Sequence, residues 1–301
     1  MEDIKEITSV RIVPFTLISS SISAVLGLLY AIIILIVLGI VGLLVPGANQ
    51  YVGLLATLGV ALIIALPVGT FFFSILSSFV MALVYNLLVP RIGGIKLGME
   101  GAEVTSIPVV PVSLMLSALY TILTFIVMLV IAPFLALFLE GAALAASTAT
   151  VAIPELAGMG DMSGLGAIMG IILIIGVPII VFIATFISIA LTAIFYNLLA
   201  PKIGGARLKL KEASHNFCEI KKIPPVSLAL IGAVVLTIVN FIFSLPSFAA
   251  NIASENVAFG LGYLVGNTLG NFIAIFIVYA LTAIIYNFLR PKIGGIEIKL
   301  D

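Results

Sequence analysis

The chain has 301 residues, 63% of them hydrophobic and 9% charged, and its formal net charge at pH 7 is zero. Soluble domains carry roughly 45–50% apolar and about 25% charged residues, so a soluble core of this length could not bury so much apolar surface. The composition predicts a polytopic α-helical membrane protein. The balanced charge removes the electrostatic argument for nucleic-acid binding.

The first repeat, over residues 1–100, begins with a polar lead that contains EITSV from Glu6 and a proline at Pro14. The apolar run that starts at Phe15 is far longer than the roughly 7–15 residues of a signal-peptide core, so we expect it to stay in the fold. Two spans are predicted, over residues 15–45 and 54–89. Each exceeds the roughly 18–20 residues that are needed to cross a bilayer.

The second and third repeats, over residues 101–212 and 213–301, copy this plan. Their leads read EVTSI from Glu103 and EIKKI from Glu219. The four further predicted spans cover residues 111–139, 165–200, 226–245 and 262–289. The middle repeat carries extra length between its two spans.

Each second span ends in the same motif, Y-N-[LF]-L-x-P-[KR]-I-G-G, which begins at Tyr85, Tyr196 and Tyr286. The residues after each Gly-Gly alternate between apolar and polar, which is typical of a half-buried strand. Each repeat is therefore predicted to fold as strand, helix, helix, strand, with a hairpin around residues 98–101 joining two repeats. The repeats could share one small cytoplasmic sheet, either closed around a pseudo-threefold axis or arranged as a linear array.

The charged residues predict an orientation in the membrane. All 13 Lys and Arg residues lie before the first span, between repeats or after the last span. The opposite loops hold only acidic charges, namely Glu140, Glu155, Asp161 and Glu255. The positive-inside rule places both termini in the cytoplasm of a cell that carries the protein in its membrane. Two spans per repeat give the repeats one orientation, unlike the inverted repeats of many transporters.

The motif supplies the candidate structural or pore residues, which are Tyr85, Asn86, Gly93, Gly94, Tyr196, Asn197, Gly204, Gly205, Tyr286, Asn287, Gly294 and Gly295. In the structural interpretation, the tyrosine rings lie at the headgroup level and the proline ends the helix. The following basic residue faces anionic headgroups, and the glycine pair turns the chain from helix into strand.

The asparagine has two interpretations, because an amide at the membrane boundary needs polar partners. It could hydrogen-bond a neighbouring helix end or the hairpin between repeats, and so lock the repeats together. Alternatively, Asn86, Asn197 and Asn287 could converge on an axis and line a polar constriction.

The chain offers few residues for enzyme chemistry, since it has one cysteine and one histidine. Cys218 has no partner in the chain for a disulfide, and a Cys/His zinc site needs about four ligands. We find no P-loop and no Ser/His/acid set with His215. Glu155 and Asp161 are a weak metal pair, and solvated loop charges are the simpler interpretation. We therefore expect no enzymatic activity, no cofactor and no metal.

Each repeat resembles a prokaryotic family of small two-span membrane proteins that is described only as a domain of unknown function. The resemblance lies in a Pro-x-Ser/Thr start, in the Tyr-Asn pair and in the Gly-Gly pair. The starts are Pro14 and Thr16, Pro111 and Ser113, and Pro225 and Ser227. The resemblance implies the two-span fold and brings no activity with it. Fusion of three copies suggests that relatives with one copy assemble as trimers.

Two functions remain open from the sequence. The first is a non-enzymatic membrane scaffold that binds the lipid bilayer and a cytoplasmic or membrane protein partner. The second is a passive channel or transporter along a pseudo-threefold axis. No ionisable side chain lies within the predicted spans, which argues against a proton-coupled carrier.

Overall fold

The structure is a computed structural model that describes residues 3–44, 52–152, 165–213, 216–254 and 257–301. Its elements follow one another as strand, helix, helix, strand, three times over. The order agrees with the pattern that the sequence predicts for each repeat. Glu155, Asp161, His215 and Glu255 lie outside the described residues, as does most of the predicted loop between Glu140 and Gly164.

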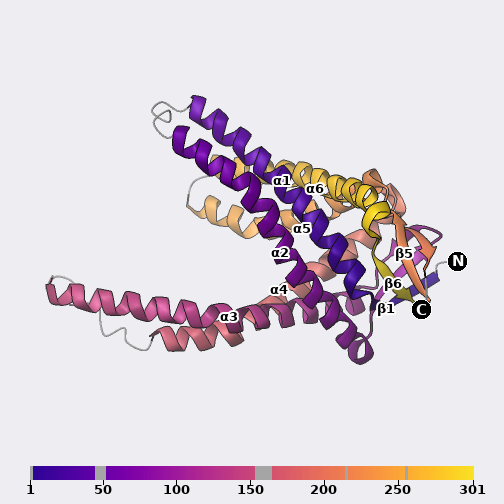
Figure 1. Ribbon diagram of the computed structural model, residues 1–301, viewed down its shortest axis with the longest axis horizontal. Coiled ribbons are helices and arrows are strands. Elements are labelled where there is room, and N and C mark those ends of the chain that lie inside the picture. Colours follow the sequence, from indigo (N-terminus) through magenta and orange to yellow (C-terminus); the bar gives the residue numbers. More distant parts are fainter. Residues whose placement is uncertain (1–2, 45–51, 153–164, 214–215, 255–256) are drawn as a thin grey trace. The chain divides into compact units, whose positions relative to one another are not determined.

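The helices are long and apolar (Figure 1). Their bounds are α1 Ile12–Leu44, α2 Val52–Ile92, α3 Val109–Ala152, α4 Leu165–Ile203, α5 Pro225–Ala253 and α6 Val257–Ile293. Among the described residues, six helices are long and apolar enough to cross a membrane, which confirms the number of spans that the sequence predicts. Large apolar side chains remain exposed along them, such as Phe73 and Phe138, each 73% exposed. Such surfaces are costly in water and suit lipid.

The chain divides into two compact units. One unit comprises Met1–Val112 and Leu191–Asp301, and it contains the sheet, α1, α2, α5 and α6. The other unit comprises Ser113–Ala190, which holds most of α3 and α4. Within the first unit, α1 packs on α2 and α6, and α5 packs on α6.

The second helix of each repeat ends at a glycine, and the prediction that the proline ends it was wrong. Helix α2 runs two residues past Pro90, to Ile92, and α4 and α6 end at the equivalent isoleucines. The next residue is Gly93, Gly204 or Gly294, with φ of +83°, +87° and +86°. Each glycine N–H donates to the carbonyl four residues earlier, at 2.9 Å. This left-handed cap favours glycine, while the proline only removes one internal N–H.

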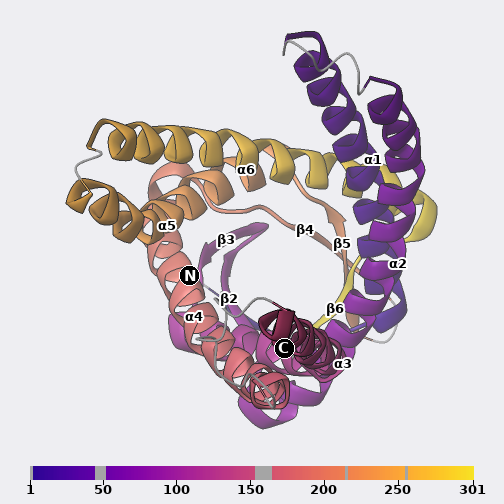
Figure 2. The same ribbon diagram turned by 90° about the vertical axis from the view of Figure 1, so that its left-hand side faces the viewer.

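The strands form one antiparallel sheet whose two edges meet. Their bounds are β1 Asp3–Val10, β2 Ile95–Glu100, β3 Glu103–Ser106, β4 Lys209–Glu212, β5 Phe217–Lys222 and β6 Glu297–Leu300. The order is β3-β2-β1-β6-β5-β4, and an antiparallel bridge joins Glu103 of β3 to Arg207, just before β4. The Val104 N–H donates to the Ala206 carbonyl at 2.8 Å, and the Leu208 N–H to the Ala102 carbonyl at 2.6 Å. The strands therefore curve into a closed ring, which Figure 2 shows from one end.

The ring connects the repeats in a cycle. Strands β1 and β2 come from the first repeat, β3 and β4 from the second, and β5 and β6 from the third. Hairpins link β2 to β3 and β4 to β5, while β6 pairs with β1 at the opposite ends of the chain. Gly101, with φ of +63°, lies in the predicted hairpin between β2 and β3. Closure leaves no long strand edge free to template further pairing.

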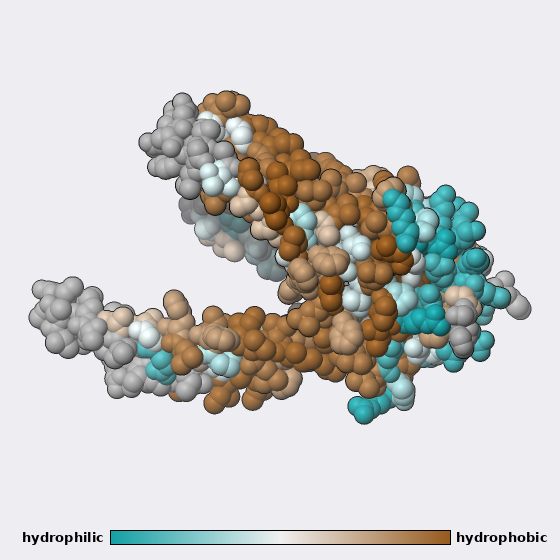
Figure 3. Space-filling view, in the orientation of Figure 1, coloured by the Kyte–Doolittle hydropathy of each residue, from teal (hydrophilic) through white to brown (hydrophobic). Residues whose placement is uncertain are grey.

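The two faces of the ring differ in chemistry. Apolar residues pair across strands on one face, as in Met99 with Val104, which are 3% and 4% exposed. Charged residues pair on the other face, as in Glu6 with Lys96. In the space-filling view, hydrophilic residues gather over the strands and apolar ones cover α1 and α2 (Figure 3). The face that carries Met99 also carries charge towards the strand ends, since Asp3 pairs with Met99 and Lys5 with Leu97.

Candidate functional site: the helix-to-strand junctions

The candidate residues of each repeat meet at one place, where the second helix returns to the ring. We call this place the junction. It comprises the Tyr-Asn pair at the helix end, the Gly-Gly turn, and the strand that opens the same repeat. The three junctions share their hydrogen bonds almost atom for atom, although the strand and the motif are separated by 76 residues or more in the first and second repeats.

The junction tyrosines are buried within the protein, and the position of their rings at the headgroup level stays a prediction. Tyr85, Tyr196 and Tyr286 are 4%, 7% and 1% exposed. The Tyr85 hydroxyl donates to the Ile7 carbonyl at 2.6 Å and accepts the Ile95 N–H at 3.0 Å. Tyr196 makes the same two bonds, at 2.6 and 2.8 Å, and Tyr286 repeats both. Each hydroxyl therefore bridges the two strands of its own repeat.

The junction asparagines pair with backbone. The Asn86 Oδ1 atom accepts the Val10 N–H at 2.8 Å, and its Nδ2 donates to the Val10 carbonyl at 2.8 Å. Asn197 makes the same pair of bonds with Ile107, at 2.7 and 2.9 Å, and Asn287 with Ile223, at 2.9 and 2.6 Å. The partner lies in the same repeat, between its first strand and first helix, and not in a neighbouring repeat. Each amide thus ties the start of the first helix to the end of the second.

The two glycines of each turn have different roles. The first adopts the left-handed conformation that ends the helix. The second lies against the backbone of the opening strand, since a Cβ on Gly94 would overlap the Ile7 carbonyl. A Cβ on Gly205 would overlap the Val104 carbonyl and lie 2.8 Å from the Tyr196 hydroxyl. The glycine pair is therefore required by φ at one position and by close approach at the other.

A glutamate completes each junction, and the sequence analysis missed its role. The Glu6 carboxylate accepts the Gly94 N–H at 2.6 Å, Glu103 accepts that of Gly205 at 2.7 Å, and Glu219 that of Gly295 at 2.9 Å. The signal was present, because the lead of every repeat begins with glutamate. The glycine N–H that this glutamate accepts could not be identified from the sequence, because two long helices separate the glutamate from the glycine in the chain.

The junction lowers the pKa of two of these glutamates. The Gly205 N–H holds the pKa of Glu103 below its ordinary value, with a further contribution from Arg207, whose Nε lies 2.9 Å away. Hydrogen bonding from Arg290 lowers the pKa of Glu219, and the Gly295 N–H adds to the effect. Both carboxylates are therefore charged acceptors at neutral pH, which strengthens their hydrogen bonds.

The third junction replaces a cross-strand ion pair with a network. Glu6 opposes Lys96 and Glu103 opposes Arg207, but Glu219 opposes Glu297. Like charges placed opposite each other destabilise a sheet. Two arginines offset the repulsion, because Arg290 pairs with Glu219 and Arg11 pairs with Glu297.

Arg11 also connects the two ends of the chain. Its guanidinium lies 4.6 Å from the centre of the Phe217 ring, and its backbone N–H donates to the Glu297 carbonyl at 2.9 Å. The residue follows β1 directly, whereas Phe217 and Glu297 belong to β5 and β6. The network therefore lies where the third repeat meets the first.

The Pro-x-Ser/Thr start links one repeat to another in the third copy. The Ser227 hydroxyl donates to the carbonyl of Gly205, at 2.7 Å, and Gly205 belongs to the turn of the second repeat. The equivalent hydroxyls of Thr16 and Ser113 are buried and have no hydrogen-bond partner among the described residues.

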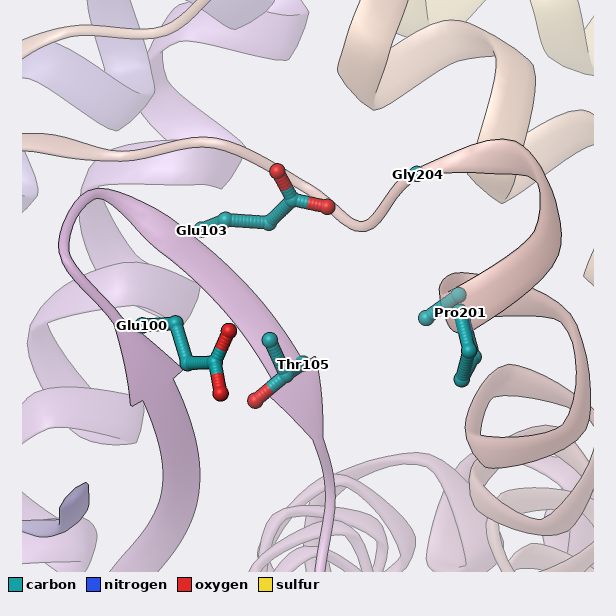
Figure 4. A pocket seen from close by; sticks show the side chains of 6 residues that line it. Glu100, Glu103, Thr105, Pro201 and Gly204 are labelled. Carbon is teal, nitrogen blue, oxygen red and sulfur yellow. The ribbon is translucent and has the colours of Figure 1, made fainter. Parts of the chain in front are cut away.

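A pocket of about 430 Å³ lies outside the ring, between the β2–β3 hairpin and the end of α4. Its lining includes Glu100, Glu103 and Thr105 from the hairpin, Pro201 from the last turn of α4, and Gly204 from the turn that follows (Figure 4). The Glu103 carboxylate is already held by Gly205 and Arg207. The one other carboxylate of the lining is that of Glu100, and a single carboxylate does not form an acid–base pair. Among the described residues, no group of three metal-ligating side chains exists. The junction residues hold backbone groups in place.

Replacing Tyr286 with phenylalanine tests the junction as a structural element. Loss of the hydroxyl leaves the Ile220 carbonyl and the Ile296 N–H without this partner, so we expect a destabilisation of about 1–3 kcal/mol. Unfolding of the purified protein in mild detergent measures it. Tyr30→Phe is the control, because Tyr30 is 45% exposed, and its change is expected within about 0.5 kcal/mol. Equal effects at both positions would contradict the bridging role.

Acid unfolding tests the charged acceptor. Because the pKa of Glu219 is lowered by folding, its contribution to stability is present above its ordinary value of 4.5 and is lost as the pH falls through the lower folded value. Glu219→Gln is expected to lower stability at neutral pH and to flatten its decline below pH 4.5. Glu212→Gln, at an exposed position of β4, is expected to change neither. An unchanged acid limb in Glu219→Gln would contradict this role.

Comparisons of the chain with protein-family models, with curated proteins and with solved structures found no match. The function of the protein is therefore inferred from the geometry of the junctions and of the ring.

Proposed function

We propose that this protein is a non-enzymatic integral membrane scaffold, in which a closed β-ring is held at one membrane surface by six membrane-spanning helices. The proposal rests on which groups the junction side chains bond. Their hydroxyl, amide and carboxylate groups all bond the backbone that joins helix to ring. Groups committed in this way make a rigid platform, and rigidity is the property that a partner-binding surface requires.

The charges favour a cytoplasmic ring. Arg91, Lys202 and Lys292 lie in the last turns of α2, α4 and α6, next to the ring. By the positive-inside rule, this end of the helices and both chain termini face the cytoplasm. The three repeats then cross the membrane in the same orientation. Neutral tyrosine and asparagine side chains satisfy the backbone where each helix leaves the lipid, which is where unpaired groups cost most.

The alternative, a passive channel or transporter on the pseudo-threefold axis, has weaker support. A pore lined by asparagines needs amide groups that are free to meet permeating solute. Here both polar atoms of Asn86, Asn197 and Asn287 bond backbone groups. An exchange of these bonds for solute would leave a helix start unsatisfied.

Thiol labelling tests the orientation. In a Cys218→Ser background, one cysteine replaces Glu100 on the ring and, in a second variant, one replaces Ser254 at the end of α5; both positions are exposed. An impermeant thiol reagent is expected to label the Ser254→Cys variant in intact cells. It is expected to label the Glu100→Cys variant only after the membrane is broken. The reverse pattern would contradict a cytoplasmic ring.

A paired experiment separates the scaffold from the channel. Liposomes containing the protein are expected to leak ions no faster than empty liposomes, and N86A, N197A and N287A are expected to be equally silent. In mild detergent, a stoichiometric protein partner is expected to co-purify and to be lost in the ring variant E100K/E212K. The control Leu137→Ala, at a 70% exposed site on α3, is expected to retain it. Ion flux that is lost when the asparagines are replaced would favour the channel over the scaffold.

A further inference from the structure

The third repeat departs from the other two on one strand. Its lead reads Glu219-Ile220-Lys221-Lys222, where the first repeat has Thr8-Ser9 and the second has Thr105-Ser106 at the last two positions. The junction bonds on either side of these positions are the same in all three repeats. The lysine pair is therefore not required by the junction, and the fold accepts Thr-Ser in its place.

The neighbouring strand adds to the charge. Lys209 on β4 lies opposite Lys222 on β5, and Lys211 lies opposite Glu219. We call Lys209, Lys211, Lys221 and Lys222 the basic strand pair; all four are exposed. Within the described part of the chain, no salt bridge involves any of them, and Glu219 is held by Arg290. Two lysines placed opposite each other repel, so the sheet carries a cost that an anionic ligand would remove.

The position of the basic strand pair is close to the apolar helices. Lys222 is separated by two residues from Pro225, where α5 begins. Because Lys209 pairs with Lys222, it lies at the same level of the ring. Val226, in the first turn of α5, is 68% exposed, so apolar surface begins next to the charges. Lysines at the end of a membrane-spanning helix lie at the depth of the lipid headgroups.

We propose that the basic strand pair binds the phosphate headgroups of anionic phospholipids and so fixes the ring against one sector of the membrane surface. The proposal rests on the membrane insertion proposed above. A phospholipid fits this place because it offers a phosphate to the lysines and acyl chains to the apolar start of α5. A nucleic acid or an acidic protein would use the charges only and would not need α5.

The absence of tryptophan from the chain allows a local measurement. Val226→Trp places a single reporter beside the basic strand pair. Val13→Trp places one at the start of α1, at a site that is 73% exposed and follows Thr8 and Ser9. Each protein is reconstituted in phosphatidylcholine that contains brominated phosphatidylglycerol or brominated phosphatidylcholine. Quenching then reports which lipid lies next to each tryptophan.

We expect brominated phosphatidylglycerol to quench the Val226→Trp reporter with a preference of at least about fivefold over brominated phosphatidylcholine, since a single lysine at a membrane surface contributes roughly fivefold. The Val13→Trp reporter is expected to show a much smaller preference. Lys221→Thr with Lys222→Ser, which installs the residues of the other repeats, is expected to lower the preference at Val226→Trp several-fold. High salt is expected to weaken it.

Two further variants keep the test decisive. Thr8→Lys with Ser9→Lys is expected to create the preference at Val13→Trp, which a misfolded protein could not do. Lys5→Thr with Lys299→Ser removes the same charge from lysines that lie near Asp3 and Asp301, at 3.7 and 3.9 Å, and is expected to leave the Val226→Trp preference intact.

The outcomes distinguish this inference from the proposed function. Equal quenching by the two brominated lipids at Val226→Trp would overturn the lipid site while supporting membrane insertion. A preference that is unchanged by Lys221→Thr with Lys222→Ser would also overturn it. Quenching by neither lipid, at either reporter, would overturn membrane insertion itself. Tighter binding of a short RNA than of phosphatidylglycerol vesicles would assign the lysines to a soluble polyanion instead.

Discussion

Backbone groups at the boundary between helix and ring must be hydrogen-bonded, and the remainder of this structure depends on how that is achieved. A helix that ends near lipid leaves carbonyl and N–H groups that water reaches poorly. Here one tyrosine, one asparagine and one glutamate supply their partners in each repeat. Because these side chains reach between the first strand and the second helix, they also fix how each helix pair leaves the ring.

Ring closure follows from that constraint. Each junction holds two strands side by side, and each hairpin passes the chain to the next pair. After three repeats the last strand meets the first. In the absence of closure, β3 and β4 would be free edges, each able to pair with another chain. The Arg11, Glu297 and Phe217 contacts at the seam between the last strand and the first differ from those of the other repeats, so they mark one correct pairing among three similar ones.

A comparison of the three repeats separates the residues that the fold uses from the residues that are available for a function. The groups that all three repeats share bond backbone in the junctions, and Arg290 of the third repeat also takes part there, whereas the lysine pair of the third repeat takes part in no junction bond. Lys221 and Lys222 stand on β5 at positions where the other repeats carry small hydroxyl side chains. A chain of similar repeats can acquire a local activity in this way, since a change in one copy leaves the common hydrogen bonds intact.

Apolar length, period-two alternation and glycine are local signals, and they predict the six helices that are long and apolar enough to cross a membrane, the strand-helix-helix-strand order and the hairpin at Gly101. Only the tertiary structure decided that the tyrosines are buried, that glycine and not proline ends each second helix, and that Glu6, Glu103 and Glu219 complete the turns. It also brought the edge strands together, through the bridge between Glu103 and Arg207. These features depend on atoms that two long helices separate in the chain, and no local pattern encodes which distant backbone group a side chain will reach.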